Sequence, residues 1–262
     1  MANEQSDIRS VTARALAVLD AFDSAHRHQT LASISRRCGL PLTTTYRLVS
    51  QLVEAQALVR TSDGSYEIGS KLWRLGLLAS VHADLREIAL PYMEDIFQLG
   101  VDAVQIGVLD GMRCLVVDRI AGSRSIEVVS RPGARLPLHA SGIGKVLLAN
   151  GSQELQDAVL ASLDRLTQHT ITNSTALRKQ LGEIKKHGFA TTREELALGA
   201  STVAVPISGF GGKAVASIGV IVSASQRDLT HLVPVLKVSA EGLARKLVAH
   251  MPVIDVMNGT IR

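Results

Sequence analysis

Apolar side chains recur at three- and four-residue intervals through the first sixty positions, the spacing that gathers them on one face of a helix. This pattern predicts three helices within residues 12–55, the second of them over 30–38. We expect Thr12 to cap the first helix and Gly39 to end the second. Pro41 suits the first turn of the third helix, because its missing N–H has no helical partner there.

The helical pattern then gives way to short apolar runs on either side of Asp63-Gly64, a sequence that predicts a hairpin within residues 58–69. Three helices and a hairpin make a self-contained unit. Residues 70–81 are predicted to form an amphipathic helix that connects this unit to the rest of the chain, and a further helix is predicted near 84–99. The connector is too apolar for a flexible linker, so we expect it to pack on another surface, for which a second copy of the chain is a candidate.

Beyond residue 100 the pattern changes to strands that come in pairs, with helices between the pairs. The predicted elements are strands within 101–120 that meet at Asp110-Gly111, a strand over 125–131, a Gly- and Pro-rich loop over 131–144, helices over 145–150, 152–162 and 174–187, a hairpin over 201–223 that turns at Gly211-Gly212, and a closing helix over 229–249 that Pro234 interrupts. Paired strands alternating with helices predict an α+β domain, with an antiparallel sheet that carries helices on its faces.

Composition narrows the class of protein. Of 262 residues, 46% are hydrophobic, which excludes a disordered chain, and only 3% are aromatic, so the core is predicted to be aliphatic. Cys38 and Cys114 lie far apart, without the spacing of a disulfide framework or a zinc site. The polar start is unlike a signal peptide, and the longest apolar stretch, 214–222, is about half a membrane span. We therefore expect a soluble cytoplasmic protein without membrane partner, metal ion or cofactor.

The net charge of +4 is concentrated in one place. Residues 27–60 contain five arginines and a single acid, Glu54, so the rest of the chain is balanced. The five are Arg27, Arg36, Arg37, Arg47 and Arg60. A positive surface on a unit of helices and a hairpin is the electrostatic pattern of a protein that binds DNA phosphates.

The third predicted helix starts with three threonines, a poor choice for helix propensity. Short hydroxyl side chains suit the first turn of a helix in the DNA major groove, where they bond phosphates or base edges. The hairpin is expected to act as a wing along the DNA backbone. The predicted contact residues are Arg9, Arg14, Arg36, Arg37, Thr43, Thr44, Thr45, Tyr46, Arg47, Ser50, Ser65 and Tyr66. Each of these residues, taken singly, could instead be a helix cap or a solvated surface charge. Because they are grouped in one unit, a role in DNA binding is favoured.

The stretch from Val11 to Leu78 resembles the N-terminal domain of the IclR family of bacterial transcriptional regulators, through RALAVLDAF, LASISRRCGLPLTTTYRLVSQLVEAQAL and GSKLWRLGLLA. The resemblance continues through RPGARLPLHASGIGKVLLA and GFATTREELALGASTVAVPI, so it covers nearly the whole chain. It implies a winged helix–turn–helix over 8–69, a linker helix over 70–82 and a GAF-like effector-binding domain over 83–252. The implied partners are double-stranded operator DNA, a small-molecule effector and the chain itself, as a dimer or a dimer of dimers.

The Gly-rich loop before residue 145 is the candidate effector site. Ser141 is placed to cap the next helix, and Gly142 and Gly144 allow a ligand to approach the backbone. The free N–H groups and dipole of a helix N-terminus favour a carboxylate. The alternative is that the glycines only permit a tight turn. The resemblance favours the ligand, because this loop lines the effector site in family members.

The resemblance also identifies pocket positions that often carry Asp, Cys or Ser in the family and are less polar here. The predicted effector contacts are Ser141, Gly142, Ile143, Thr192, Thr202, Gly219 and Ile221. A small, highly polar acid would find few partners among them, since buried polar groups of a ligand need matching groups in the site. We expect an effector with an aromatic or apolar body and one carboxylate, controlling a catabolic operon.

Two other classes of function are weighed against a regulator. An enzyme with an accessory N-terminal domain would need catalytic machinery, but no G-x-S-x-G, H-E-x-x-H or GK[ST] motif is present, and nothing local supports a pair of Cys114 with His139. His139 is expected to be a structural hydrogen-bonding residue and Cys114 a buried small hydrophobe. Arg131 and Arg135 flank the loop, either as added positive potential or as solvated charges. A DNA-binding protein without a ligand would not need the Gly-rich loop. No catalytic residue is therefore assigned.

Overall fold

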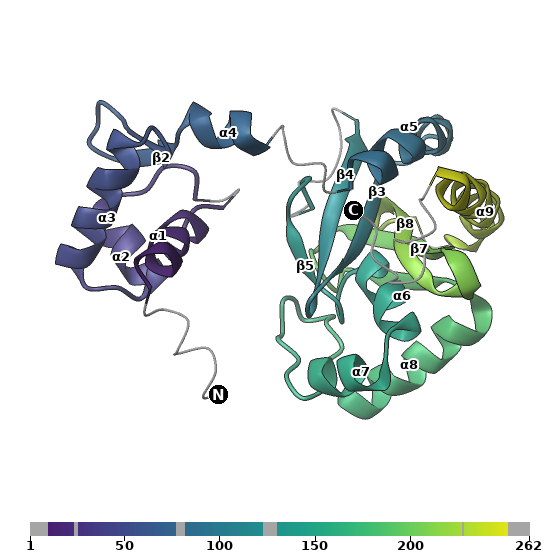
Figure 1. Ribbon diagram of the computed structural model, residues 1–262. Coiled ribbons are helices and arrows are strands. Elements are labelled where there is room, and N and C mark those ends of the chain that lie inside the picture. The colour runs from purple at the N-terminus through teal and green to yellow at the C-terminus, as the bar shows by residue number, and fades with distance from the viewer. Residues whose placement is uncertain (1–9, 24–25, 77–81, 123–129, 227, 251–262) are drawn as a thin grey trace. The chain divides into compact units, whose positions relative to one another are not determined.

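The computed structural model describes residues 10–23, 26–76, 82–122, 130–226 and 228–250 (Figure 1). The chain forms two compact units that divide between Ser80 and Val81. This division falls within the linker that the sequence predicts.

The N-terminal unit is a bundle of short helices with a two-stranded antiparallel sheet. Its elements are α1 (Val11–Asp20), α2 (Leu31–Cys38), α3 (Leu42–Glu54), β1 (Leu58–Arg60), β2 (Tyr66–Ile68) and α4 (Ser70–Gly76). Val18, Ile34 and Leu48 come from three different helices and are buried together, as the helical spacing of apolar residues predicts. Gly39 ends α2 in the left-handed conformation, with φ of 68°, and so allows the tight turn into α3.

Three details of this unit differ from the sequence prediction. Ser10, not Thr12, caps α1, because the Ser10 side chain accepts a hydrogen bond from the amide of Ala13. Pro41 occupies the N-cap position of α3, one residue before the first helical turn. The predicted connector helix is described only as far as Gly76, and its remaining residues, 77–81, lie outside the described part of the chain.

The C-terminal unit is built on an antiparallel sheet with the strand order β5-β4-β3-β8-β7-β6 in the described residues. The strands are β3 (Ala103–Asp110), β4 (Arg113–Ala121), β5 (Arg135–Pro137), β6 (Ala190–Arg193), β7 (Ala200–Ser208) and β8 (Ala214–Ser223). The helices are α5 (Ala83–Phe97), α6 (Gly142–Asn150), α7 (Gln153–Leu160), α8 (Ser174–His187) and α9 (Val233–His250), with short 3-10 turns η2 (Phe210–Gly212) and η3 (Thr230–Leu232). The α+β fold predicted from the paired strands is confirmed.

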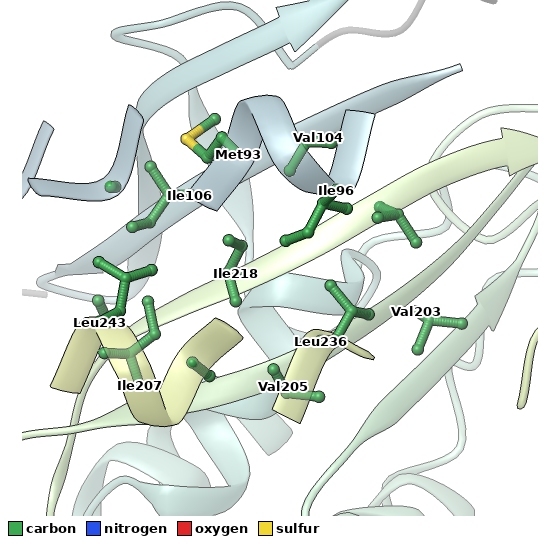
Figure 2. Packing of buried hydrophobic residues seen from close by; sticks show 14 of the residues in the cluster. Met93, Ile96, Val104, Ile106, Val203, Val205, Ile207, Ile218, Leu236 and Leu243 are labelled. Atoms are coloured by element: carbon green, nitrogen blue, oxygen red, sulfur yellow. The ribbon is translucent and has the colours of Figure 1, made fainter. Parts of the chain in front are cut away.

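Helices α5 and α9 cover one face of the sheet (Figure 1). Alternate strand residues such as Ile106 and Ile218 point to these helices and meet Met93 of α5 and Leu243 of α9 (Figure 2). Branched aliphatic side chains fill this layer, as the low aromatic content predicts.

Helix α6 packs on the opposite face, where small residues let it approach the strands closely. A Cβ atom added to Gly107 of β3 would lie 2.7 Å from the Cys114 sulfur and 2.9 Å from the Ile143 side chain. A Cβ atom added to Gly219 of β8 would lie 2.9 Å from that of Ala204. These two glycines are therefore packing positions under α6.

Other predicted elements are altered in their bounds. Helix α6 begins at Gly142, three residues earlier than predicted. Pro234 does not interrupt the closing helix, because it is the second residue of α9, where proline is tolerated. Most of the predicted strand over 125–131 lies outside the described residues.

Candidate functional site

The exposed surface of α3 carries a stripe of polar side chains at helical spacing. Thr43, Tyr46, Arg47 and Ser50 are exposed, and the Tyr46 side chain is 59% accessible. Residues three and four apart lie on one face of a helix, so these four share a face. Leu48, on the opposite face, is buried in the core of the unit. The stripe is a surface of hydroxyls and one guanidinium, chemistry that suits phosphates and base edges.

The structure removes Thr45 from this set. Its side chain is fully buried, and its hydroxyl lies 3.1 Å from the carbonyl oxygen of Pro41, to which it donates a hydrogen bond. Thr45 therefore stabilises the start of α3 from inside the unit and presents nothing to a ligand. Thr44 is partly exposed at the edge of the stripe.

The predicted arginines differ in their freedom to reach DNA. Arg36 is exposed at the end of α2. Arg37 is held by the unit itself, because its Nε donates to the carbonyl oxygen of Ala21 at 2.8 Å and its Nη2 to the Asp23 carboxylate at 2.5 Å. Its guanidinium ties α2 to the end of α1, so Arg37 is corrected to a structural residue. Arg14 of α1 donates from Nε to the carbonyl oxygen of Ser10 at 3.4 Å, and Arg9 lies outside the described residues.

The wing hairpin is organised around an acid. The hydroxyls of Thr61 and Ser65, with the Ser65 amide, donate to the carboxylate of Asp63 and lower its pKa to about 2. Ser65 is buried in this turn, and Tyr66 is buried in the core with Arg60 over its ring. Both residues were predicted to contact DNA and are corrected to structural roles, because neither side chain is exposed.

In the C-terminal unit, five of the seven predicted effector residues line one cavity. Thr192 of β6 lies opposite Thr202 of β7, which lies opposite Ile221 of β8, so the three make a row across the sheet. This row forms the floor of the cavity, and Ser141 and Gly142, at the start of α6, lie above it.

The first turn of α6 offers hydrogen-bond donors to this cavity. Within the described residues, the amides of Gly142, Ile143 and Gly144 have no acceptor. Ser141 occupies the N-cap position but does not cap, because its hydroxyl donates to the carbonyl oxygen of Pro137 at 2.8 Å. The predicted side-chain cap is thus wrong, and its absence leaves the amides available. A helix N-terminus with unpaired amides and no acidic residue favours an anion.

The other cavity walls combine a hydroxyl pair with apolar side chains. The hydroxyl oxygens of Thr192 and Thr202 are 2.6 Å apart and bond each other, which leaves one hydroxyl hydrogen committed and lone pairs open. Leu196 and Ala197, in the loop between β6 and β7, and Ala200, the first residue of β7, also line the cavity.

A buried ion pair anchors this loop. The Lys145 ammonium on α6 lies 2.7 Å from both carboxylate oxygens of Glu195 and 2.7 Å from the side-chain oxygen of Gln180. Lys145 is fully buried, and burial lowers its pKa while the Glu195 charge opposes that shift. The Glu194 carboxylate accepts from the Gly199 amide at 2.8 Å and closes the loop on itself.

Two predicted effector residues do not line the cavity through their side chains. Ile143 is buried in the layer beneath α6, so it offers only its amide. Gly219 is a packing position below that side chain. Sequence reasoning missed Gln105 of β3, a cavity residue with 2% of its surface exposed. Its polarity within an otherwise apolar strand was the available signal.

The cavity volume is only about 10 Å³, room for a single water molecule. A hollow of about 500 Å³ beside the edge strand β6 is larger, but Thr192 is the only predicted effector residue that lines it. We assign the candidate site to the smaller cavity because Ser141 and Gly142, at the start of α6, line it together with three other predicted effector residues.

Other candidates have structural roles. His139 bonds the carbonyl oxygen of Asp164 at 2.9 Å, and burial raises the pKa of the Cys114 thiol to about 12. Arg135 pairs with Asp110 at 2.8 Å. Among the described residues, no group of His, Cys, Asp and Glu has the arrangement of a metal site, and no helix has the length and apolarity needed to cross a membrane.

Family comparisons cover both units. Residues 11–62 match the model of the IclR helix-turn-helix domain, and residues 78–245 match that of the bacterial transcriptional regulator IclR C-terminal domain. Curated relatives in Escherichia coli K12 include the HTH-type transcriptional repressor AllR, 28% identical over 79% of this chain and 78% of that protein. Another is the HTH-type transcriptional regulator XynR, 28% identical over 82% of this chain and 86% of its own length.

Comparison with solved structures also identifies IclR homologues. An IclR homologue from Microbacterium hydrocarbonoxydans, complexed with 4-hydroxybenzoate, is 32% identical, with a TM-score of 0.81 over 92% of this chain and 100% of that one. The IclR of Thermotoga maritima is 28% identical, with a TM-score of 0.69 over 90% of this chain and 98% of that one. These relatives are named as regulators and not as enzymes. The chain belongs to the IclR family of bacterial transcriptional regulators.

Proposed function

We propose that this regulator binds the operator DNA of a catabolic operon through the exposed stripe of α3. We further propose that it dissociates from this DNA when an aromatic carboxylate enters the cavity below α6. The observation that carries the proposal is the first turn of α6, where the amides of Gly142, Ile143 and Gly144 have no acceptor among the described residues and Gly142 lines a cavity with largely apolar walls. These amides would receive the carboxylate, and Ile221 and Leu196 would pack on the ring.

The relatives support the proposed class of ligand and the proposed role as a repressor. The Microbacterium hydrocarbonoxydans homologue is complexed with 4-hydroxybenzoate, an aromatic ring with one carboxylate and one hydroxyl. In this chain the Thr192–Thr202 pair lies beside Gly142 and has open lone pairs, so it would contact a polar substituent near the carboxylate. AllR is named a repressor, and we propose the same sense of control here.

Entry of a ring requires the cavity walls to move outward, because the present volume fits one water molecule. A ligand that binds only the opened form shifts the population towards it. If operator DNA favours the closed form, the two ligands oppose each other by linkage. This coupling is the proposed switch.

A second copy of the chain is the proposed partner of α4. Trp73 and Leu75 on this helix are 66% and 53% exposed, an unusual state for large apolar side chains so close together. A dimer through this helix would present two copies of α3 to a two-fold operator in the cytoplasm. Trp73→Glu should convert the dimer to a monomer in analytical ultracentrifugation, and an unchanged mass would place the contact elsewhere.

A gel-shift on the DNA upstream of the gene, with and without 4-hydroxybenzoate, tests the function directly. We expect a retarded band that 4-hydroxybenzoate releases and glyoxylate does not. Release by glyoxylate alone would overturn the aromatic effector.

Arg47→Ala tests the reading surface. It should weaken operator binding and reduce the slope of log affinity against log salt by about one, with effector binding unchanged. Arg27→Ala removes the same charge from an exposed position off α3 and serves as the control. Equal losses in the two variants would mean that charge alone, and not the α3 stripe, carries recognition.

A further inference from the structure

Arg119 on β4 carries an unused hydrogen-bonding edge inside the C-terminal unit. Its Nε and Nη2 atoms are buried and have no hydrogen-bond partner within the part of the chain that the structure describes. These two nitrogens form one side of the guanidinium, the side that binds both oxygens of a carboxylate in parallel. Buried polar atoms are nearly always paired in proteins, so an empty fork of this kind requires an explanation.

The strand register places Arg119 on the cavity side of the sheet. Arg119 lies opposite Gln105 of β3, and residues directly opposite on neighbouring strands project from the same face. Gln105 lines the effector cavity. The next pair in the register, Ile106 with Asp118, faces the other way: Ile106 lies in the α5 and α9 layer, and Asp118 binds Arg86 of α5 at 2.7 Å.

The acid next to Arg119 in sequence is therefore not its partner. One carboxylate oxygen of Asp118 is bonded to Arg86, and the other accepts only the backbone amide of Arg119. The nearest charge that acts on the guanidinium is instead a second cation. Burial, together with the charge of Arg131, lowers the pKa of Arg119. The surroundings of the fork are thus positive, which favours an anion there.

Gln105 adds a second unpaired group at the same end of the cavity. Its side-chain oxygen is buried and has no partner among the residues that the structure describes. On one side, Gln105 pairs with Arg119 of β4. On the other side it pairs with Gly219 of β8, which pairs in turn with Ala204 of β7, below the first turn of α6. From β7, below Gly142, to β4 the sheet spans three strand spacings, or about 14 Å. This spacing across the sheet is comparable to the length of a para-substituted aromatic acid together with its polar contacts.

We infer that the Arg119 guanidinium forms a second anion subsite at the Gln105 end of the effector cavity, and that the effector is an aromatic acid with an acidic group at each end. One carboxylate binds the amides of α6, and the other occupies the empty fork of Arg119. This inference builds on the proposed aromatic carboxylate and specifies its far end.

Calorimetry with benzoate, 4-hydroxybenzoate, benzene-1,4-dicarboxylate and the aliphatic hexanedioate tests the subsite. The native protein should bind benzene-1,4-dicarboxylate about 10- to 100-fold more tightly than benzoate, the gain expected from a bidentate charge-assisted contact. Arg119→Gln should abolish that preference and leave benzoate affinity unchanged. Arg119→Lys keeps the charge without the fork and should restore only part of it. Arg113→Gln, an exposed arginine on the same strand, should change neither.

A thermal measurement separates this role from a structural one. An unpaired buried guanidinium destabilises the ligand-free fold, so Arg119→Met should melt at the same temperature as the native protein or higher. A lower melting temperature would show that Arg119 supports the fold and would overturn the inference.

The other outcomes of the calorimetry are distinct. Equal affinity for benzoate and the aromatic dicarboxylate in the native protein overturns the subsite and leaves the proposed function standing. Binding of hexanedioate that depends on Arg119, without binding of any aromatic acid, supports the subsite and overturns the aromatic effector. Failure of all four acids to bind overturns both.

Discussion

The Lys145–Glu195 pair lends itself to a sharp test, because its loss should affect stability far more than that of other ion pairs in the same unit. Glu195→Gln keeps the shape of the side chain and removes its charge. The Lys145 ammonium then remains fully buried, with only neutral acceptors such as the Gln180 oxygen at 2.7 Å and no negative charge to balance it. Removing one partner of a buried pair costs about 3–5 kcal/mol, since the other charge is left uncompensated.

The magnitude converts to a measurable shift. For a domain of about 150–250 residues, each kcal/mol lowers the melting temperature by roughly 2–4 °C, so Glu195→Gln should lower it by about 6–20 °C. Asp157→Asn is the matched control: it breaks the Arg178–Asp157 pair, which has the same 2.7 Å separation but lies in solvent. It should leave the melting temperature unchanged, because solvent screens exposed pairs.

Differential scanning calorimetry of the native protein and both variants decides the matter. Equal, small shifts for Glu195→Gln and Asp157→Asn would refute the reasoning that burial makes this pair an anchor. The double variant Lys145→Met with Glu195→Leu should recover most of the loss, since no buried charge remains. Without that recovery, the loss would have to come from packing and not from charge.

Three further predictions concern the same unit. Gly142→Ala should destabilise it by about 1–3 kcal/mol, because the added Cβ overlaps the Thr202 side chain, whereas Gly182→Ala, in open space on α8, should stabilise it slightly in the same denaturant titration. Iodoacetamide should label Cys38 in the native protein but Cys114 only after unfolding, since burial raises the pKa of the Cys114 thiol to about 12; native labelling of Cys114 would contradict its burial. Glu194→Ala, which frees the Gly199 amide, should loosen the cavity loop and raise the calorimetric affinity for the effector, and a lower affinity would show that the closed loop is the binding form.

The α3 stripe shows how far sequence reasoning reaches. Helical spacing correctly predicted the helix and its buried Leu48, and the same spacing puts Thr45, three residues earlier, on the buried face. Because the three threonines were treated as one run, the buried position of Thr45 was not predicted. Arg37 is a different case. Its hydrogen bonds to Ala21 and Asp23 join residues sixteen and fourteen positions away, and no local pattern predicts such contacts.

The candidate effector cavity shows what sequence reasoning could not predict. The Gly-rich loop and the helix after it were predictable from composition, and the family resemblance supplied Thr192 and Thr202. Which of these side chains meet depends on the register between β3, β8 and β7, which sequence alone did not determine. Gln105 was missed because its neighbours on β8 are more than a hundred residues away in the chain.

In the proposed mechanism, two neighbouring turns of α6 both act on the cavity. The first turn supplies the unpaired amides that would bind the carboxylate, and directly after it Lys145 holds Glu195, which anchors the loop that closes the cavity. A ligand that pushes this loop outward therefore works against a buried pair on the same helix that binds it. The apparent affinity of a protein whose open form is rare falls in proportion to the population of that form. If the effector binds as proposed, the strength of the anchor, and not only the contacts within the cavity, would set the effector concentration at which the regulator responds.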